Sequence, residues 1–143
     1  MNAASLPSLV QRFFTQRLLE QQGLSSHTVA SYRDTFRLLL GFATQHLGRA
    51  PSKLLTEELD VPFMEKFLRH LELRRGNSVR TRNTRLAAVH AFFRFVAISE
   101  PALGLQCQRI LAIPAKRYEH GPVEFLTEEE TNALVTAPDA GTW

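Results

Sequence analysis

The stretch "NSVRTRNTRLAAVHAFFRFV", residues 77–96, is basic at its head and apolar at its tail. At about 100° per residue, its apolar side chains and the next alanine cover roughly half the circumference of a helix. These positions are Leu86, Ala88, Val89, Phe92, Phe93, Phe95, Val96 and Ala97. So wide an apolar face is typical of a helix in the middle of a bundle. With Ser78 as its N-cap and Pro101 limiting its extension, we expect this helix over residues 79–98.

Helical spacing recurs along the rest of the chain, whereas no run of residues alternates apolar and polar side chains as a strand does. Further helices are expected over residues 7–22, 26–47 and 61–75, with a short fifth helix over 105–113. Ser25 or Ser26 can cap the second of these helices and Asp60 the third, because their side chains accept hydrogen bonds from free backbone N–H groups. The predicted fold class is all-α with four main helices.

Residues 114–125, "PAKRYEHGPVEF", contain two prolines and a glycine without apolar periodicity, which predicts an interdomain linker after a domain over 1–113. The next residues, "LTEEETNALVTA", begin a new helix, because Thr127 and Glu130 have capping-box spacing. We therefore expect residues 126–143 to be the first helix of a truncated second domain.

The composition fits a globular chain, with 44% hydrophobic and 22% charged residues among 143. No stretch approaches ~18 uninterrupted apolar residues and the N-terminus lacks a secretory pattern, so we expect a cytoplasmic protein without membrane contact. Cys107 is the only cysteine and the five histidines lack ligand spacing, so neither a metal nor another cofactor is expected. We find no carboxylate pair, no nucleophile with its base and no phosphate-binding glycine loop in the sequence. We therefore do not expect an independent enzyme.

The charge is unevenly distributed along the chain. All 17 basic residues but only 8 of the 14 acidic ones lie in residues 1–118, so the remaining 25 residues carry six acidic and no basic side chains. Fourteen of the basic residues are arginines, whose planar fork pairs well with phosphates and base edges. A polyanionic partner is one interpretation, and the arginine preference of a high-GC genome is the other.

A polar stripe lies opposite the apolar face of the predicted helix 79–98. Its members, at spacings of three and four, are Arg80, Asn83, Thr84, Ala87, Ala91 and Arg94. Small residues allow close approach of another surface, and Arg, Asn and Thr are types that reach phosphates and base edges in the major groove. We therefore predict that this stripe faces a DNA groove.

The start of the same helix crowds positive charge against the helix dipole, which disfavours cations there. Arg82 and Arg85 fall nearer the core side than Arg80, and Arg74 and Arg75 precede the Gly76 turn. We predict phosphate contacts at this helix mouth, since free N–H groups and arginines would converge on an anion. The alternative is a basic end that only faces solvent.

The predicted helix 26–47 carries a second basic face. Arg33 and Arg37 are four residues apart and repel each other weakly unless something lies between them, and Thr28 lies near the helix start. Two helices with basic faces can straddle a duplex. The alternative for Arg33 and Arg37 is an ordinary solvent face, partly neutralised by Asp34.

Three blocks of the sequence resemble the phage-integrase, or tyrosine recombinase, family and occur in its order. They are "SSHTVASYRDTFRLLLGFA" (25–43), "SVRTRNTRLAAVHAFFRFV" (78–96) and "PVEFLTEEETNALVTAP" (122–138). The resemblance implies an N-terminal core-binding, SAM-like domain whose four main helices form two crossed hairpins. It also implies that this domain clamps duplex DNA together with a catalytic domain that would follow Trp143.

Carried onto this sequence, the resemblance makes the second and fourth helices the DNA-facing ones. The candidate contacts it implies are Thr28, Arg33, Arg37, Arg80, Arg82, Asn83, Thr84, Ala87 and Arg94. Tyr32 and Tyr118 match neither the position nor the context of the family's tyrosine nucleophile, so no catalytic residue is expected here. The implied partners are double-stranded DNA, which would place the protein at the nucleoid, and other recombinase protomers on that DNA, with the isolated fragment monomeric.

A helical protein-interaction or oligomerisation module is the competing hypothesis. Leu19, Leu38 and Phe42 lie off the predicted core faces and could meet another protomer. A stable dimer that ignores DNA would favour this hypothesis over DNA binding.

Overall fold

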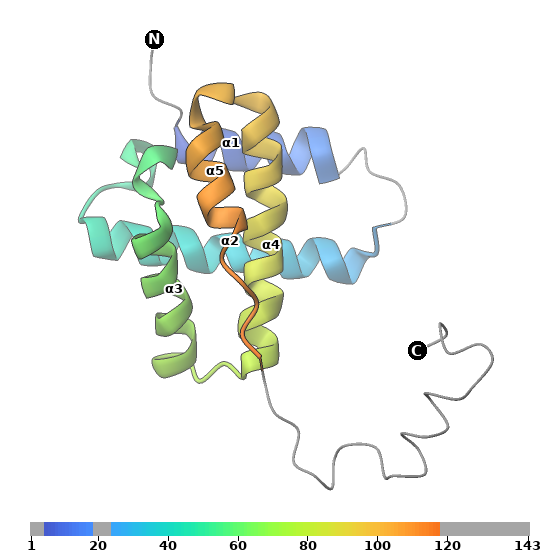
Figure 1. The fold of residues 1–143 in the computed structure, drawn as a ribbon, viewed down its shortest axis with the longest axis vertical. Helices are drawn as coiled ribbons and strands as arrows, with labels where there is room; N and C mark the ends of the chain where they lie inside the picture. The colour runs from blue at the N-terminus through green and yellow to red at the C-terminus, as the bar shows by residue number, and fades with distance from the viewer. Residues whose placement is uncertain (1–4, 19–23, 118–143) are drawn as a thin grey trace, which may run out of the picture.

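The computed structural model describes residues 5–18 and 24–117, and the all-α class is confirmed for them (Figure 1). The main elements are α1 (Leu6–Arg12) with the π-helix η1 (Phe13–Leu18), α2 (Ser26–Leu47), α3 (Val61–Leu73), α4 (Val79–Ser99) and α5 (Gly104–Leu111). Short 3-10 turns cover Pro51–Lys53, Thr56–Glu58 and Pro101–Leu103. None of the described helices is long and apolar enough to cross a membrane.

The three predicted N-caps are confirmed. The side chain of Ser25, rather than Ser26, accepts a hydrogen bond from the Thr28 N–H at 3.1 Å. Asp60 caps α3 at 3.0 Å, and Ser78 caps α4 through the Thr81 N–H at 3.1 Å. Each cap satisfies a backbone donor that the first turn of a helix leaves without a partner.

The first helix differs most from its prediction. The α-helix ends at Arg12 and continues as η1, while the predicted residues 19–22 lie outside the described part. The Thr15 hydroxyl donates to the Gln11 carbonyl at 3.0 Å, which is the acceptor that the Thr15 N–H would use in an α-helix. Apolar spacing alone does not separate an α turn from the wider π turn, because both place residues three to five apart on one face.

The other helix ends fall within two residues of prediction. α3 ends at Leu73 rather than residue 75, because the chain turns back there. The Arg74 N–H still bonds to His70 O at 2.8 Å, but the Asn77 N–H returns to Leu71 O at 3.0 Å. Gly76 adopts a φ of 64°, which glycine reaches without strain. The helix predicted within 126–143 lies outside the described residues.

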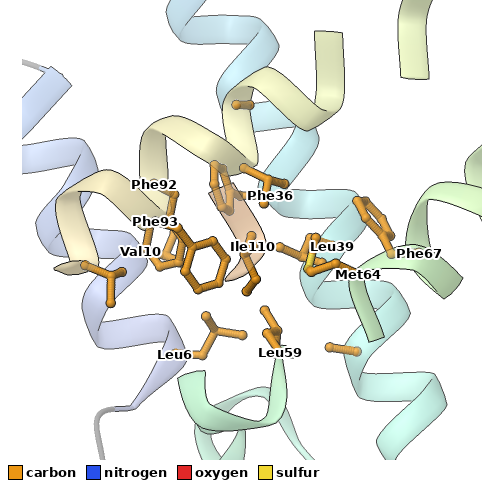
Figure 2. Close-up of a cluster of buried hydrophobic side chains, with 14 of the residues drawn as sticks. Leu6, Val10, Phe36, Leu39, Leu59, Met64, Phe67, Phe92, Phe93 and Ile110 are labelled. Carbon is orange, nitrogen blue, oxygen red and sulfur yellow. The ribbon is translucent and has the colours of Figure 1, made fainter. Parts of the chain in front are cut away.

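The core is built from side chains of every helix (Figure 2). Leu6 and Val10 of α1, Phe36 and Leu39 of α2, Met64 and Phe67 of α3, Phe92 and Phe93 of α4 and Ile110 of α5 converge there. Of the eight apolar positions predicted for the fourth helix, all are buried except Ala97, which is half-buried. Full burial of one such large side chain contributes about 1.5–3 kcal/mol.

α4 lies at the centre of the arrangement and contacts α2, α3 and α5. In Figure 1, α1 and α2 run across the view, whereas α3 and α4 run along it. The pairing of these helices into two crossed hairpins stays a prediction. α5 turns back beside α4, and the chain after it descends toward the start of α4 (Figure 1). The end of the described chain thus returns to the basic head of α4.

Candidate nucleic-acid interface

The outer row of α4 is the part of the predicted stripe that faces solvent. We use this name for Arg80, Thr84, Ala87, Ala91 and Arg94, of which all but the half-buried Ala91 are exposed. At 1.5 Å of rise per residue, the row extends about 21 Å along the helix. Arginines at the two ends flank small residues, so another surface can approach the middle of the helix closely.

The corner between α3 and α4 adds charge at the start of this row. Arg74 and Arg75 are exposed directly after α3, and the Gly76 turn brings the chain round to Arg80 in the first turn of α4. Free backbone N–H groups of a helix start and three exposed guanidinium groups are therefore grouped at one end of the molecule.

Arg82 lies inward of the outer row. Its side chain is only 13% exposed, its Nη1 donates to the Asn83 Oδ1 at 3.0 Å, and its Nε lies 3.7 Å from a carboxylate oxygen of Glu72 on α3. The guanidinium of Arg82 therefore joins α4 to α3.

Asn83 holds the segment that leaves the domain. Its Nδ2 donates to the Lys116 carbonyl at 2.7 Å, and its Oδ1 accepts from the Lys116 N–H at 2.8 Å. The Lys116 ammonium pairs with Glu72 at 3.0 Å, and Ile113 is buried. We call residues 113–117 the exit strap, because these contacts tie it along α3 and α4 (Figure 1).

Arg85 joins α4 to α2. Its Nη1 donates to the Ser31 carbonyl and to the Thr35 hydroxyl oxygen, both at 3.2 Å. Thr35 is completely buried and donates its own proton to the Ser31 carbonyl at 2.9 Å. Arg82, Asn83 and Arg85, which we call the inner row, thus have partners within the fold.

On α2, Arg33 and Arg37 are exposed and border a hollow of about 390 Å³ beside Val10 of α1 and Phe14 of η1. Arg37 pairs with Asp34 at 3.2 Å, but their side chains are 72% and 53% exposed, so the pair is worth at most about 1 kcal/mol. None of the residues that line this hollow belongs to the outer row. The basic face of α2 and the outer row of α4 therefore border different parts of the surface.

Thr28 is half-buried in the first turn of α2. Its hydroxyl lies 3.0 Å from the Ser25 hydroxyl, and its N–H is the group that Ser25 caps. The structure therefore assigns Thr28 to the helix cap. Its predicted DNA contact stays a prediction.

Burial shifts the pKa of two groups, His90 and Cys107, toward their neutral forms. Burial lowers the pKa of His90, a hydrogen bond to the Ile110 carbonyl opposes this, and the charge of Arg94 lowers the pKa further. Burial also raises the pKa of the Cys107 thiol, which makes it a poor nucleophile. Within residues 5–18 and 24–117, no group of three His, Cys, Asp or Glu side chains could hold a metal ion.

The sequence patterns did not predict that Glu72 and Lys116 help to hold the exit strap. Residues 114–117 are exposed and non-helical, and the two hydrogen bonds between Lys116 and Asn83 join positions 33 residues apart. No local pattern signals such a contact, because it depends on how α5 turns back along α4.

Comparison with known proteins gives a consistent result. The model of the phage integrase N-terminal SAM-like domain matches residues 10–100. Two proteins of Sinorhizobium fredii named "Putative integrase/recombinase", y4rC and y4rD, are 52% and 42% identical over 98% and 96% of this chain. "Tyrosine recombinase XerC" of Pelotomaculum thermopropionicum is 28% identical over 88% of it.

The chain spans 42%, 49% and 40% of the lengths of these three relatives, so it corresponds to less than half of each. No solved structure matches it. The matched residues 10–100 include α2, α3 and α4 in full, together with the outer and inner rows. The chain belongs to the phage integrase family of tyrosine recombinases and contains the family's N-terminal SAM-like domain.

Proposed function

We propose that this chain is the DNA-binding module of a site-specific tyrosine recombinase. The observation that carries the proposal is the exposed outer row of α4, with the arginines of the α3–α4 corner at one end and Arg94 at the other. Arginine, threonine and alanine in one exposed line offer phosphate contacts at the ends and close approach in the middle.

The inner row changes how the predicted contacts divide. Arg82, Asn83 and Arg85 remain predicted contacts, but each must give up or share a partner within the fold to reach DNA. Within the described residues, the side chains of Arg33, Arg74, Arg75 and Arg94 form no hydrogen bond or ion pair, and Arg37 forms only the weak pair with Asp34. Arg80 is exposed as well. These exposed groups are the primary contacts in the proposal.

Residues 1–113 are the proposed binding domain, 114–125 the proposed linker and 126–143 the proposed start of a catalytic domain. The strand-cleaving chemistry would then belong to the part of the recombinase beyond this chain. The proposed partners are duplex DNA and, on that DNA, further recombinase protomers, with the protein in the cytoplasm at the nucleoid.

The competing hypothesis of an oligomerisation module has less support from the described residues. Phe42 packs between α2 and α3, with ring centroids 5.4 Å from Phe63 and 5.7 Å from Phe67, and Leu38 packs against the core. Leu19 lies outside the described part. We therefore expect light scattering to show a monomer in the absence of DNA.

Binding of a fluorescent duplex to the chain of 143 residues, measured by anisotropy at several salt concentrations, tests the proposal. We expect the logarithm of affinity to fall linearly with the logarithm of salt, with a slope of about −0.9 for each phosphate contacted. The matched control replaces Arg109, an exposed arginine of α5, by glutamine and should leave the slope unchanged. No binding at low salt, or binding insensitive to salt, would contradict the proposal.

A further inference from the structure

A pocket of about 260 Å³ lies where η1, α2 and α4 meet. Arg17 of η1, Tyr32 of α2 and Arg94 of α4 line it with Phe13, Leu18, Leu24 and Ala91. The two guanidinium groups and the phenol thus come from three elements, of which α4 is distant from the other two in the sequence. Ala91 and Arg94 also belong to the outer row, so the pocket lies at the far end of that row from Arg80.

The charges around this pocket are unbalanced. Among the residues that the structure describes, two arginines line it and no carboxylate does. In the described part of the chain, neither Arg17 nor Arg94 forms an ion pair, and the Tyr32 hydroxyl forms no hydrogen bond. Like charges facing one hollow repel each other, and an anion bound between them removes that repulsion.

The walls of the pocket are held by aromatic packing. The Phe13 ring contacts Phe92 and Phe95 of α4 with centroids 5.6 and 5.7 Å apart, which fixes η1 against α4. Tyr32 stacks on the same Phe13 ring at 6.3 Å with an interplanar angle of 15°. Arg17 lies one turn further along η1, and π-helical turns of this kind occur frequently at functional sites.

We propose that this pocket binds one phosphate of the DNA backbone through Arg17, Arg94 and Tyr32. A phosphodiester carries one negative charge and two free oxygens, which two guanidinium forks and a hydroxyl donor complement. Continuity with the outer row favours a DNA phosphate over a free anion, because a duplex along Ala87 and Ala91 would bring its backbone to Arg94. This inference rests on the proposed DNA binding and adds Arg17 and Tyr32 to the contacts.

Single and double substitutions measured by duplex anisotropy test the pocket. Arg17→Gln and Arg94→Gln should each weaken binding about 3- to 10-fold, whereas the salt slope should fall by about 0.9 only in the double variant, because either arginine alone still contacts the phosphate. Because both arginines hold one phosphate, the double variant should lose less affinity than the product of the two single losses. Tyr32→Phe, which keeps the ring stacking, should weaken binding about 2- to 4-fold without changing the slope.

The outcomes separate this proposal from the one on which it rests. If the unaltered chain binds DNA but Arg17→Gln and Arg94→Gln behave like the control Arg109→Gln, the pocket proposal fails and DNA binding stands. If the unaltered chain does not bind DNA, the proposed function fails. A third outcome is that inorganic phosphate raises the melting temperature and Arg17→Gln abolishes this rise while leaving DNA affinity unchanged. That result would show that the pocket binds a free anion rather than a DNA phosphate.

Discussion

The outer and inner rows of α4 have the same kinds of side chain and opposite surroundings. Arg80 and Arg94 lie on the exposed face, whereas Arg82 and Arg85 lie one or two positions off that line and reach into contacts with α3 and α2. A shift of two residues turns an arginine by about 200° around the helix. Residue type alone therefore does not tell an arginine that can meet DNA from one that holds the fold.

The largest expected effect is on stability, from Arg85→Ala. The substitution removes both hydrogen bonds between α4 and α2 and leaves the buried Thr35 oxygen without its donor, so the free energy of unfolding should fall by about 2 kcal/mol. Urea denaturation followed by circular dichroism measures this loss. If Arg85→Ala lost DNA binding while its stability stayed unchanged, Arg85 would act as a DNA contact rather than as a support of the fold.

Arg80→Gln should have the opposite profile. DNA affinity should fall by about 1 kcal/mol, because one phosphate contact is lost, while the free energy of unfolding stays within about 0.5 kcal/mol of the unaltered chain since Arg80 is exposed. Anisotropy and urea denaturation of the same sample give the two values. A clear loss of stability would place Arg80 with the inner row.

Asn83→Ala should release the exit strap, because both hydrogen bonds to the Lys116 backbone are lost. The free energy of unfolding should fall by about 1 kcal/mol. Trypsin cleavage after Lys116 and Arg117 should then accelerate several-fold, as the opened strap is the better substrate. Thr84→Ala, on the exposed side of the same turn, is the matched control. Equal cleavage rates in both variants would argue that the strap is not held by Asn83.

Glu72→Gln should lower the free energy of unfolding by a smaller amount, about 0.5–1 kcal/mol. The substitution weakens the ion pairs with Arg82 and Lys116, of which the Lys116 side chain is 52% exposed and screened by water. The loss should shrink at high salt, when the unfolding free energies of the two proteins are compared at 0.05 and 0.5 M sodium chloride. A salt-independent difference would show that packing rather than charge is responsible.

The smallest effect concerns pH and His90. Because burial holds the folded-state pKa of His90 below the ordinary value of 6.5, the unfolded chain binds more protons as pH falls below that value. The stabilisation by neutral His90 is therefore complete above pH 6.5 and is lost as pH falls toward the lowered pKa. Between pH 5 and 7.5, the melting temperature of His90→Gln should therefore depend less on pH than that of the unaltered chain.

The fold could be predicted where the determinants are local. Ser25, Asp60 and Ser78 each act on a backbone N–H three residues away, and the apolar positions of α4 repeat at helical spacing. Both signals are complete within about twenty residues of sequence. The all-α class and the starts of α2, α3 and α4 follow from them.

The candidate site could be predicted only as a set of residue types. Arg85 donates to the buried Thr35 from a helix fifty positions away, and Asn83 meets Lys116 because α5 folds back. Such contacts depend on the packing of whole helices, which no short pattern contains. The pocket of Arg17 and Arg94 likewise exists only once η1 packs on α4.

The exit strap also determines where a tether begins. A helix the length of α4 extends about 32 Å, and without the return of α5 the chain would leave the domain at the far end from Arg80. Because the strap fixes Lys116 beside Asn83 instead, whatever follows it in the chain starts near the basic head of α4. A short tether anchored there raises the effective concentration of the next segment around any bound phosphate backbone. Loosening the strap would lower that effective concentration while leaving the exposed outer row unchanged.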